Sequence, residues 1–425
     1  MPVNMFIPVR RNFSAGGPIY HSSIIFLAIN AYFWYKLVMS VLERRTWAKI
    51  DLDIFKNNLK HIRDFTNAEL LIPIKADAYG HGSCELARVA EEFGVEYLGV
   101  AGIEEAIELR EYGIKIPIVI LSPVFDFDIE DIIYYNVIPT VSDIDFAKNL
   151  NDYLNKMSKS IDIFIEVDTG MGRTGFLYDV AYGKIETIKN QFTNLRIKSI
   201  FSHFSTAEDE EDDFALTQIN QFKELKRKLI QSGLTDAKFH ISNSAGMVRF
   251  NDPEMAIVRP GILAYGLYTS ENMKKYIDVQ PIMSVYSRIS RIANLNKGDS
   301  VSYGRRILDR NLKVATINIG YGDGFPHCLS DKGYVAIKGK KSKIIGNVCM
   351  DLTMVDISGI DNIRVGDIVT IINGEITADD LAKQCNTINY EIITRIGERV
   401  SRIYYENGKP IKVRTIASRK IHNKL

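Results

Sequence analysis

From Arg45 onward the sequence alternates between short runs of apolar and β-branched residues and longer stretches whose apolar residues recur every three or four positions. The first pattern predicts buried β-strands, and the second predicts amphipathic helices such as residues 84–93 and 214–232. Eight strand-like runs come first, at residues 70–75, 97–101, 116–121, 137–141, 161–167, 197–201, 238–242 and 256–264. Eight strand and helix units over about 220 residues predict an α/β fold of the (β/α)8 TIM barrel type.

After about Pro281 the sequence is rich in Val, Ile and Gly, and short runs such as 313–319, 342–348 and 369–372 predict strands and turns. We therefore expect a barrel over residues 46–280 and a mostly β C-terminal domain over residues 281–425. Because no flexible Gly/Ser linker joins the two domains, they are expected to pack firmly together.

Charge and cysteine content exclude several classes of protein. The 53 basic and 52 acidic residues leave a formal charge of +1 and form no long basic run, so nothing indicates nucleic-acid binding. The four cysteines are widely spaced and form no CxxC pair; they are Cys84, Cys328, Cys349 and Cys385. This spacing predicts neither a metal site nor a disulfide framework, and it favours a reducing, cytoplasmic setting for the catalytic domain.

Residues 1–45 precede the predicted barrel as an N-terminal extension. Within it residues 24–42 are almost entirely apolar and just long enough to span a bilayer, with arginines on both sides. Asn30 and Lys36 interrupt this segment, and no small-residue cleavage site of a secretory signal follows it. Three interpretations stay open: a membrane tether, an interfacial helix, and an extension outside the fold.

Functional groups of a barrel lie at the carboxyl ends of its strands. The first predicted strand ends at Lys75, and Tyr79 follows four residues later. A lysine partly shielded from water has a lowered pKa and can act as an amine nucleophile or a base. A lysine at the rim that extends its amine into solvent is the alternative.

Polar groups follow the later strands as well. Hydroxyl and glycine positions after the last two strands, at Ser244 and Gly261, are where barrels commonly hold a phosphate, the glycine through a free backbone N–H. A lysine at one strand end and a phosphate site at two others point to pyridoxal 5'-phosphate as cofactor.

Several distinctive blocks follow one another along the chain: PIKADAYGHG, DTGMGR, SHFSTAED, HISNSAG, VRPG, SYGRR, GYGDGFP and CMD. In these blocks, from about Thr46 nearly to the C-terminus, the chain resembles the alanine racemase family. The resemblance implies a pyridoxal phosphate barrel followed by a β domain, in a head-to-tail homodimer with shared active sites. It also implies interconversion of the small amino acids L- and D-alanine, which supplies D-alanine for peptidoglycan.

By this resemblance Lys75 binds the cofactor covalently and is one of two catalytic bases. Tyr303, in the SYGRR block, matches the second base, which reaches into the site of the other subunit. A pair of bases is chemically reasonable, because racemisation removes a proton from one face of the α-carbon and returns one to the other.

The resemblance also assigns the groups around the cofactor. Arg259 matches the arginine that faces the pyridine nitrogen, and because a guanidinium hardly ever loses its proton, the ring should be a weaker electron sink. His203 and His240 match the hydrogen-bond network behind Arg259 and Tyr303. The phosphate-contacting positions of the family are matched by Tyr79, Ser244, Gly261 and Ile262.

Substrate contacts are implied in the same way. Arg173 resembles the arginine that binds the substrate carboxylate, a task suited to a forked donor. Met350 matches a backbone contributor to that carboxylate site from the second subunit, with Asp351 beside it in a supporting role.

Two positions depart from the family pattern. Glu166 stands where many members carry a carbamate-modified lysine, and its carboxylate is expected to hold Arg173 without any modification. Glu398 stands where some members have a tyrosine that borders the substrate. If Glu398 lines the pocket, a hydroxyl-bearing substrate gains a partner, so serine racemisation is an alternative activity. Membrane-linked serine racemases have a similar catalytic domain.

Two further functions are weighed against racemisation. Pyridoxal phosphate decarboxylases of basic amino acids share the barrel and β-domain architecture, but they place an acidic residue at the ring nitrogen, where this chain has Arg259. Non-catalytic pyridoxal phosphate carriers share the barrel and lack the domain that bears Tyr303 and Met350. The sequence therefore favours an alanine racemase.

Overall fold

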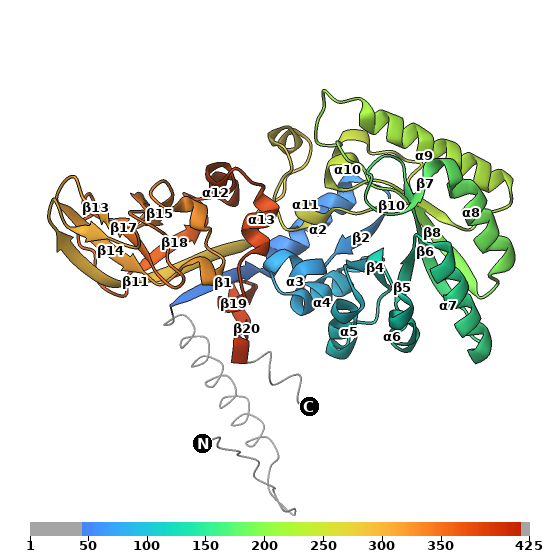
Figure 1. The fold of residues 1–425 in the computed structure, drawn as a ribbon, viewed down its shortest axis with the longest axis horizontal. Coiled ribbons are helices and arrows are strands. Elements are labelled where there is room, and N and C mark those ends of the chain that lie inside the picture. The colour runs from blue at the N-terminus through green and yellow to red at the C-terminus, as the bar shows by residue number, and fades with distance from the viewer. Residues whose placement is uncertain (1–44, 418–425) are drawn as a thin grey trace, which may run out of the picture. The chain divides into compact units, whose positions relative to one another are not determined.

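The computed structural model describes residues 45–417 (Figure 1). The apolar segment 24–42, and with it the expected membrane association, lies outside the described residues. Within residues 45–417 no helix combines the length and the apolar character that a membrane span needs. Figure 1 shows a helix-covered barrel beside a mostly β domain, as the sequence predicts.

Eight parallel strands form the barrel, in the order β10-β2-β3-β4-β5-β6-β8-β9. Between the last and first strands the contact consists of a parallel bridge between Asn243 and Arg259 and a 2.9 Å hydrogen bond from Ala256 N to Phe239 O. The strands are β2 (Glu69–Pro73), β3 (Tyr97–Val100), β4 (Ile118–Pro123), β5 (Ile138–Val141), β6 (Ile161–Asp168), β8 (Leu195–Phe201), β9 (Lys238–His240) and β10 (Ile257–Val258). The short strand β7 (Phe176–Leu177) pairs with β6.

The eighth predicted strand is mostly not a strand. Within residues 256–264 only Ile257–Val258 forms a strand, Arg259 adds a single bridge to Asn243, and Gly261–Ala264 forms a short helix, α11. Pro260 lies between them and has no N–H to donate to a strand ladder, so the extended run ends there.

Alternation along the strands divides the barrel core in two. Leu71 packs inside the barrel with one side chain from each of six other strands, whereas its neighbours Leu70 and Ile72 join the larger core outside it. Because successive strand side chains point to opposite faces, a continuous apolar run supplies both cores at once.

Amphipathic helices cover the outside of this barrel. They are α2 (Leu52–Phe65), α4 (Ser83–Phe93), α5 (Ile103–Tyr112), α6 (Ile129–Tyr134), α7 (Ile144–Met157), α8 (Tyr178–Gln191), α9 (Phe214–Gln231) and α10 (Ser244–Phe250). In α2 the buried Phe55, Leu59 and Ile62 recur at helical spacing, and the carboxylate of Asp51 accepts a hydrogen bond from Ile54 N at the N-terminus.

The second domain is built on a sheet of order β16-β15-β18-β11-β1-β19-β20, to which β14 and β17 are added. Its strands are β1 (Thr46–Asp51), β11 (Met283–Leu295), β14 (Leu312–Ile317), β15 (Tyr334–Ile337), β16 (Lys340–Lys343), β17 (Thr353–Asp356), β18 (Ile368–Ile372), β19 (Ser401–Glu406) and β20 (Lys409–Arg414). Two short helices, α12 (Ala378–Cys385) and α13 (Asn389–Thr394), accompany them.

Strand β1 belongs to this second sheet, although the sequence analysis counted residues from 46 onward with the barrel. It runs antiparallel to β11, with Thr46 opposite Ser287, and parallel to β19, with Trp47 opposite Ser401. The described part of the chain, residues 45–417, therefore starts in the β domain, forms the barrel and returns to the β domain. Local sequence cannot reveal this, because partners hundreds of residues away decide which sheet a strand joins.

The cysteine prediction is wrong for one pair. Cys328, in the short 3-10 helix η4 (His327–Leu329), and Cys385, at the end of α12, form a disulfide across 57 residues, whereas Cys84 and Cys349 are free. Only tertiary packing brings the two together, so spacing along the chain gave no signal.

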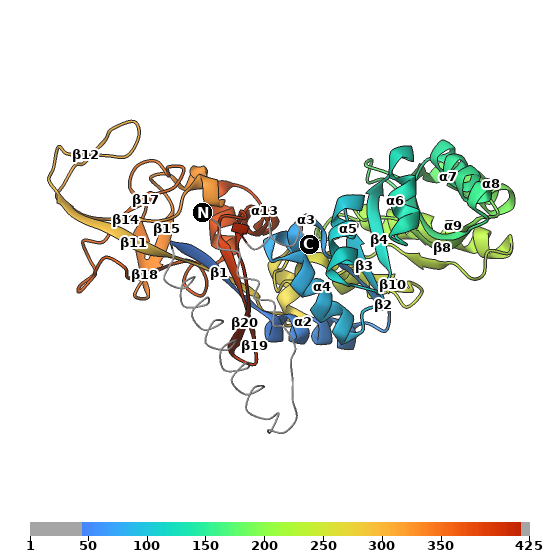
Figure 2. The same ribbon diagram turned by 90° about the horizontal axis from the view of Figure 1, so that it is seen from below.

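A small hairpin extends from the end of the β domain that is farthest from the barrel (Figure 2). Its strands are β12 (Ser300–Val301) and β13 (Arg306–Ile307), and its turn contains Tyr303. A side chain on this turn is therefore remote from the barrel of its own chain.

Candidate active site

A cavity of about 740 Å³ lies at the carboxyl ends of the barrel strands. Side chains that follow several different strands meet in it, and those predicted from the sequence are Lys75, Tyr79, Arg173, His203, Ser244, Arg259 and Gly261. Residues of α12 and α13 from the β domain, among them Lys383 and Tyr390, complete the wall. The barrel rim and the second domain thus share one site.

The turn that presents Lys75 and Tyr79 is left-handed. It follows β2 as α3 (Lys75–Gly80), in which the four residues Ala76–Tyr79 have φ between 52° and 54°. For L-residues this conformation costs roughly 1–2 kcal/mol per residue. Surrounding contacts must hold such a turn in place, and sequence propensities give no warning of it.

Lys75 is poised to react through its amine. Burial lowers the pKa of its ammonium group, and the nearby positive charges of Arg173 and Arg259 lower it further, whereas Glu105 and Glu166 oppose the change. A lowered pKa increases the fraction of neutral amine, which is the nucleophilic and basic form.

Three of the predicted phosphate positions form a pocket with room for an anion. Ser244 is buried, and its hydroxyl oxygen has no hydrogen-bond partner among the described residues. Burial raises the pKa of Tyr79 to about 12, so its hydroxyl remains a proton donor. A Cβ on Gly261 would lie 2.8 Å from that hydroxyl. Because Gly261 has no side chain, the space beside Tyr79 stays open. The hydroxyl of Ser244, which has no partner among the described residues, can donate a hydrogen bond to a phosphate oxygen.

Gly261 contributes space rather than the free N–H that the sequence analysis expected. Its backbone N–H donates to Arg259 O at 2.9 Å. Ile262, also predicted to contact a phosphate, is fully buried and does not line the cavity.

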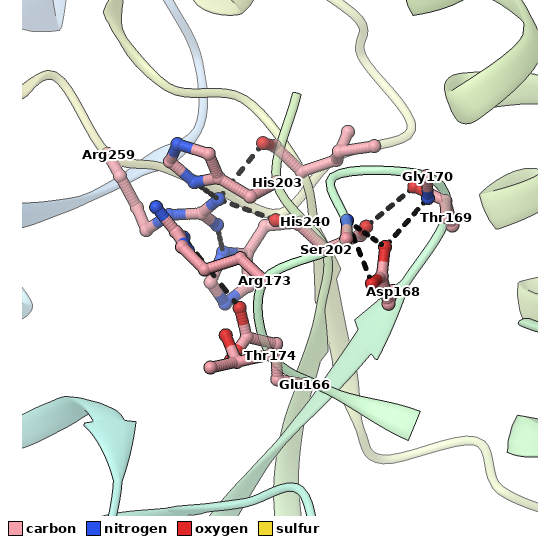
Figure 3. A network of polar contacts seen from close by, with 12 residues as sticks. Glu166, Asp168, Thr169, Gly170, Arg173, Thr174, Ser202, His203, His240 and Arg259 are labelled. Carbon is pink, nitrogen blue, oxygen red and sulfur yellow. Dashed lines mark hydrogen bonds and ion pairs between the residues drawn. The ribbon is translucent and has the colours of Figure 1, made fainter. Parts of the chain in front are cut away.

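Arg259 lies between the two predicted histidines (Figure 3). Its Nη1 donates to Nδ1 of His240, and its Nη2 lies 3.2 Å from Nδ1 of His203. Nη2 also donates to two backbone carbonyls, Ser202 O at 2.6 Å and Ile241 O at 3.0 Å. All these contacts involve the two terminal nitrogens, so they orient the planar guanidinium.

Protonation in this network follows from burial. Burial lowers the pKa of His203 and of His240 well below the ordinary value, and the charge of Arg259 lowers both further. Burial also lowers the pKa of Arg259 to about 9, which still leaves the guanidinium charged at neutral pH. The two neutral imidazoles therefore accept hydrogen bonds from the Arg259 guanidinium, which is charged at neutral pH.

Glu166 lies close to Arg173, the residue that it is expected to hold. It is 2% exposed, near the end of β6, and its Oε2 accepts a hydrogen bond from the Thr174 hydroxyl at 2.7 Å. Its Oε1 lies 3.9 Å from Nη2 of Arg173, whose side chain is 48% exposed (Figure 3). Burial raises the pKa of Glu166, and Thr174 and Arg173 oppose the rise. The structure therefore joins a buried carboxylate to an arginine at the cavity.

Sequence reasoning missed residues that shape the site. The carboxylate of Asp168 accepts from the backbone N–H groups of Gly170 and Gly172 at 2.8 and 2.9 Å, which folds the loop that carries Arg173 (Figure 3). Tyr265 packs 4.8 Å from the ring of Tyr79 and donates to the carbonyl of Pro73. Asp168 lies inside the DTGMGR block, which was the available signal, whereas no local pattern marked Tyr265.

The three predicted residues of the β domain do not line this cavity. Tyr303 is 74% exposed and Met350 is 52% exposed, both on the surface of the β domain. Asp351 forms an ion pair with Arg399 at 2.6 Å, and its carbonyl accepts from Arg45. Glu398, the suggested pocket residue, is exposed and does not line the cavity within the chain either.

Comparison with known proteins places this chain in a family. Sequence profiles described as alanine racemase, N-terminal domain, and alanine racemase, C-terminal domain, match residues 50–269 and 282–404. An alanine racemase of Clostridium novyi is 39% identical over 381 residues, covering 87% of this chain and 98% of the relative.

Solved structures agree with the sequence relatives. Alanine racemase from Clostridium difficile 630 superposes with a TM-score of 0.83 at 35% identity, over 88% of this chain and 98% of that one. The Bartonella henselae alanine racemase, described with covalently bound pyridoxal phosphate, has a TM-score of 0.77 at 27% identity and covers 85% of this chain and all of its own.

Proposed function

The chain belongs to the alanine racemase family, and we propose that it interconverts L-alanine and D-alanine with pyridoxal 5'-phosphate as cofactor. The observation that carries this is the cavity itself. A lysine of lowered pKa, an unpartnered buried serine hydroxyl and an arginine fixed between two histidines surround one space. The product D-alanine would serve peptidoglycan synthesis.

The residues present fit the cofactor at each of its ends. Lys75 would hold it covalently, and Ser244 and Tyr79 would donate to its phosphate in the space that Gly261 leaves open. Arg259 would donate to the ring nitrogen through Nε–H, because its two terminal nitrogens make the contacts with histidines and carbonyls. When bound, the cofactor supplies an electron sink for the charge left on the α-carbon after proton loss.

An arginine at the ring nitrogen of the cofactor would restrain side reactions. Arg259 keeps its own proton at neutral pH and donates only a hydrogen bond, because its pKa of about 9 remains well above neutrality. Neutral His203 and His240 accept from the guanidinium and cannot supply a proton in its place. A less strongly polarised ring favours return of the proton to the α-carbon over other outcomes.

The substrate carboxylate would bind to Arg173. Glu166, with Thr174 bonded to its second oxygen, would hold the guanidinium toward the cavity by charge attraction. The fixed carboxylate thus takes the place of a modified side chain.

Two bases would exchange the α-proton, Lys75 on one face and the partner subunit's Tyr303 on the other. Exposure of Tyr303 on a hairpin remote from its own barrel supports an arrangement in trans, since an exposed tyrosine can reach a second copy (Figure 2). Met350, also exposed on the β domain, would join the same shared site. We therefore propose a homodimer with two sites, each made by both subunits.

The activity is tested by racemisation of L-alanine, followed by circular dichroism, with L-serine as the competing substrate. Lys75→Ala and Tyr303→Phe should each abolish or nearly abolish turnover, because each removes one base. Full activity in either variant would contradict the two-base proposal. Faster turnover of L-serine than of L-alanine would contradict alanine as the substrate.

Mixing the two variants tests whether the site is shared. In a mixed dimer one site combines intact Lys75 with intact Tyr303, and the other site lacks both. Random exchange of equal amounts should therefore restore about a quarter of wild-type activity. A mixture that stays inactive after verified subunit exchange would show that each site is built within one chain.

A further inference from the structure

The left-handed turn that carries Lys75 and Tyr79 is held from outside the barrel. Two arginines on the last strands of the β domain, Arg402 on β19 and Arg414 on β20, contact it. They are more than 320 positions from the turn in sequence. None of the sequence blocks discussed above includes either of them.

Arg402 is 2% exposed, and its hydrogen bonds within residues 45–417 all go to backbone carbonyls. Its Nε and Nη2 donate to Gly80 O at 3.2 and 2.9 Å, directly after Tyr79. The remaining bonds go to Ile396 O, Gly397 O and Val400 O at 2.5 to 2.6 Å. A planar five-donor fork can tie the end of the turn to the β domain in this way, and a lysine ammonium cannot reproduce it.

Arg414 binds the middle of the turn. Its Nη1 lies 2.6 Å from Oδ1 of Asp77, an oxygen that also accepts from Ser83 N at 2.9 Å. Burial alone would raise the pKa of Asp77, but Arg414 and Arg402 hold it below its ordinary value. Asp77 is therefore a charged anchor of the turn, and it does not line the cavity.

The β domain also lies very close to Gly80 and Gly82. A Cβ on Gly80 would lie 2.4 Å from Ile393 O of α13, and one on Gly82 would lie 1.8 Å from the hydroxyl of Tyr404 on β19. The turn is therefore seated against the β domain with no room for side chains at these two positions.

Four consecutive L-residues with positive φ do not stay left-handed without external support. The support comes from the β domain, so the placement of Lys75 and Tyr79 depends on how that domain is docked. We propose that Arg402 and Arg414 are positioning residues of the active site, which hold the left-handed turn so that Lys75 meets the cofactor. This inference rests on the proposed function for the identity of the cofactor.

The test compares Arg414→Gln and Arg402→Lys with the wild-type chain. Arg414→Lys is the conservative rescue, because it keeps a cation opposite Asp77. Arg63→Gln is the matched control, since Arg63 makes a 2.8 Å ion pair with Glu96 and donates to Gly94 O next to the start of β3. Each protein is assayed for pyridoxal phosphate affinity by absorbance titration, for borohydride trapping on Lys75, for kcat and KM, and for thermal stability without cofactor.

We expect Arg414→Gln to weaken cofactor binding and to lower kcat, each by about tenfold or more, while KM changes by less than about twofold. Trapping on Lys75 should slow in parallel, and Arg414→Lys should recover most of the loss. Arg402→Lys should behave like Arg414→Gln, and Arg63→Gln should match the wild type in every cofactor readout.

A purely structural role predicts a different pattern. If both variants lose thermal stability but bind cofactor, trap and turn over like the wild type, the inference is wrong. Should Arg402→Lys fail to fold, Arg414→Gln decides alone. Cofactor binding and trapping on Lys75 do not require racemisation. A wild-type chain that binds the cofactor but does not racemise alanine would refute the proposed function. The positioning role of Arg402 and Arg414 would then be judged by binding and trapping alone.

Discussion

Replacing Glu166 by Gln separates the charge of this residue from its shape. Glutamine keeps an oxygen for the Thr174 hydroxyl but removes the negative charge that faces Arg173 at 3.9 Å. Two unit charges at about 4 Å interact by about 4 kcal/mol at an effective dielectric constant of 20. Because the Arg173 side chain is 48% exposed, water screens much of this, and roughly 1–2 kcal/mol is a reasonable net value.

If that energy serves to orient Arg173 toward the substrate carboxylate, Glu166→Gln should lower kcat/KM for alanine roughly 5- to 30-fold. The measurement is racemisation at constant ionic strength. In an Arg173→Lys background the same replacement should cost less, because the pair is already disturbed. Glu96→Gln, which disturbs the remote Arg63 pair, is the control and should leave kcat/KM unchanged.

The Glu166→Gln replacement should raise the stability of the folded chain, although it lowers kcat/KM. The pKa of Glu166 is raised by burial, so the folded chain binds this proton more tightly than the unfolded chain. Stability linked to this group is present below the ordinary glutamate pKa and is lost as pH rises through the folded-state pKa. Relative to wild type, the Gln variant should therefore gain thermal stability as pH rises above the ordinary glutamate pKa.

Unchanged kcat/KM in the Gln variant would refute the role of Glu166 in holding Arg173. A variant that is less stable than wild type at the higher pH would refute the argument that burial of the charge costs stability. The two readouts are independent, so either part can fail alone.

Three further predictions concern the cofactor pocket and the disulfide. Ser244→Ala removes the unpartnered hydroxyl, and pyridoxal phosphate affinity in absorbance titrations should fall about tenfold, as expected for a lost hydrogen bond to a charged group; an unchanged affinity would place the phosphate elsewhere. Gly261→Ala puts a Cβ 2.8 Å from the Tyr79 hydroxyl, so the same titration should show weaker binding, while Gly183→Ala, on an open helix surface, should not. Cys385→Ser opens a disulfide across 57 residues and should lower the free energy of unfolding by about 2–4 kcal/mol in urea titrations, a difference that should vanish under reducing conditions.

Much of the fold could be predicted from periodicity alone. Seven of the eight predicted barrel strands coincide with observed strands to within a few residues, because parallel strands buried on both faces appear as continuous apolar runs. The eighth failed at Pro260, where an apolar run continues as a helix. Hydrophobicity reports burial, and in a short run it does not distinguish a strand from a helical turn.

Other features depend on partners far away in the sequence. Thr46–Asp51 was counted with the barrel but joins the sheet of the C-terminal domain, where it lies between β11 and β19. Cys328 and Cys385 pair because α12 packs on η4. Neither partner choice has a local signal, since each is decided by the free energy of the assembled core.

For the candidate site as well, some features could be predicted from the sequence and others could not. The motif blocks predicted Lys75, Arg259 and Arg173 as site residues by residue type and order, because the chemistry of cofactor and carboxylate binding demands an amine and fixed cations, and all three line the cavity. The blocks did not show that two neutral histidines hold Arg259, nor that the N–H of Gly261 is already bonded.

The sequence by itself therefore determined the class of fold, the family and the residue types that are candidates for the site. Only the tertiary structure decided how those groups are aimed: a left-handed turn at Ala76–Tyr79, held by Arg402 and Arg414, and a Tyr303 that is exposed in its own chain. The physical reason is that residue type sets which interactions a side chain can make, whereas handedness, burial and partner are set by contacts between segments that the chain separates by hundreds of residues.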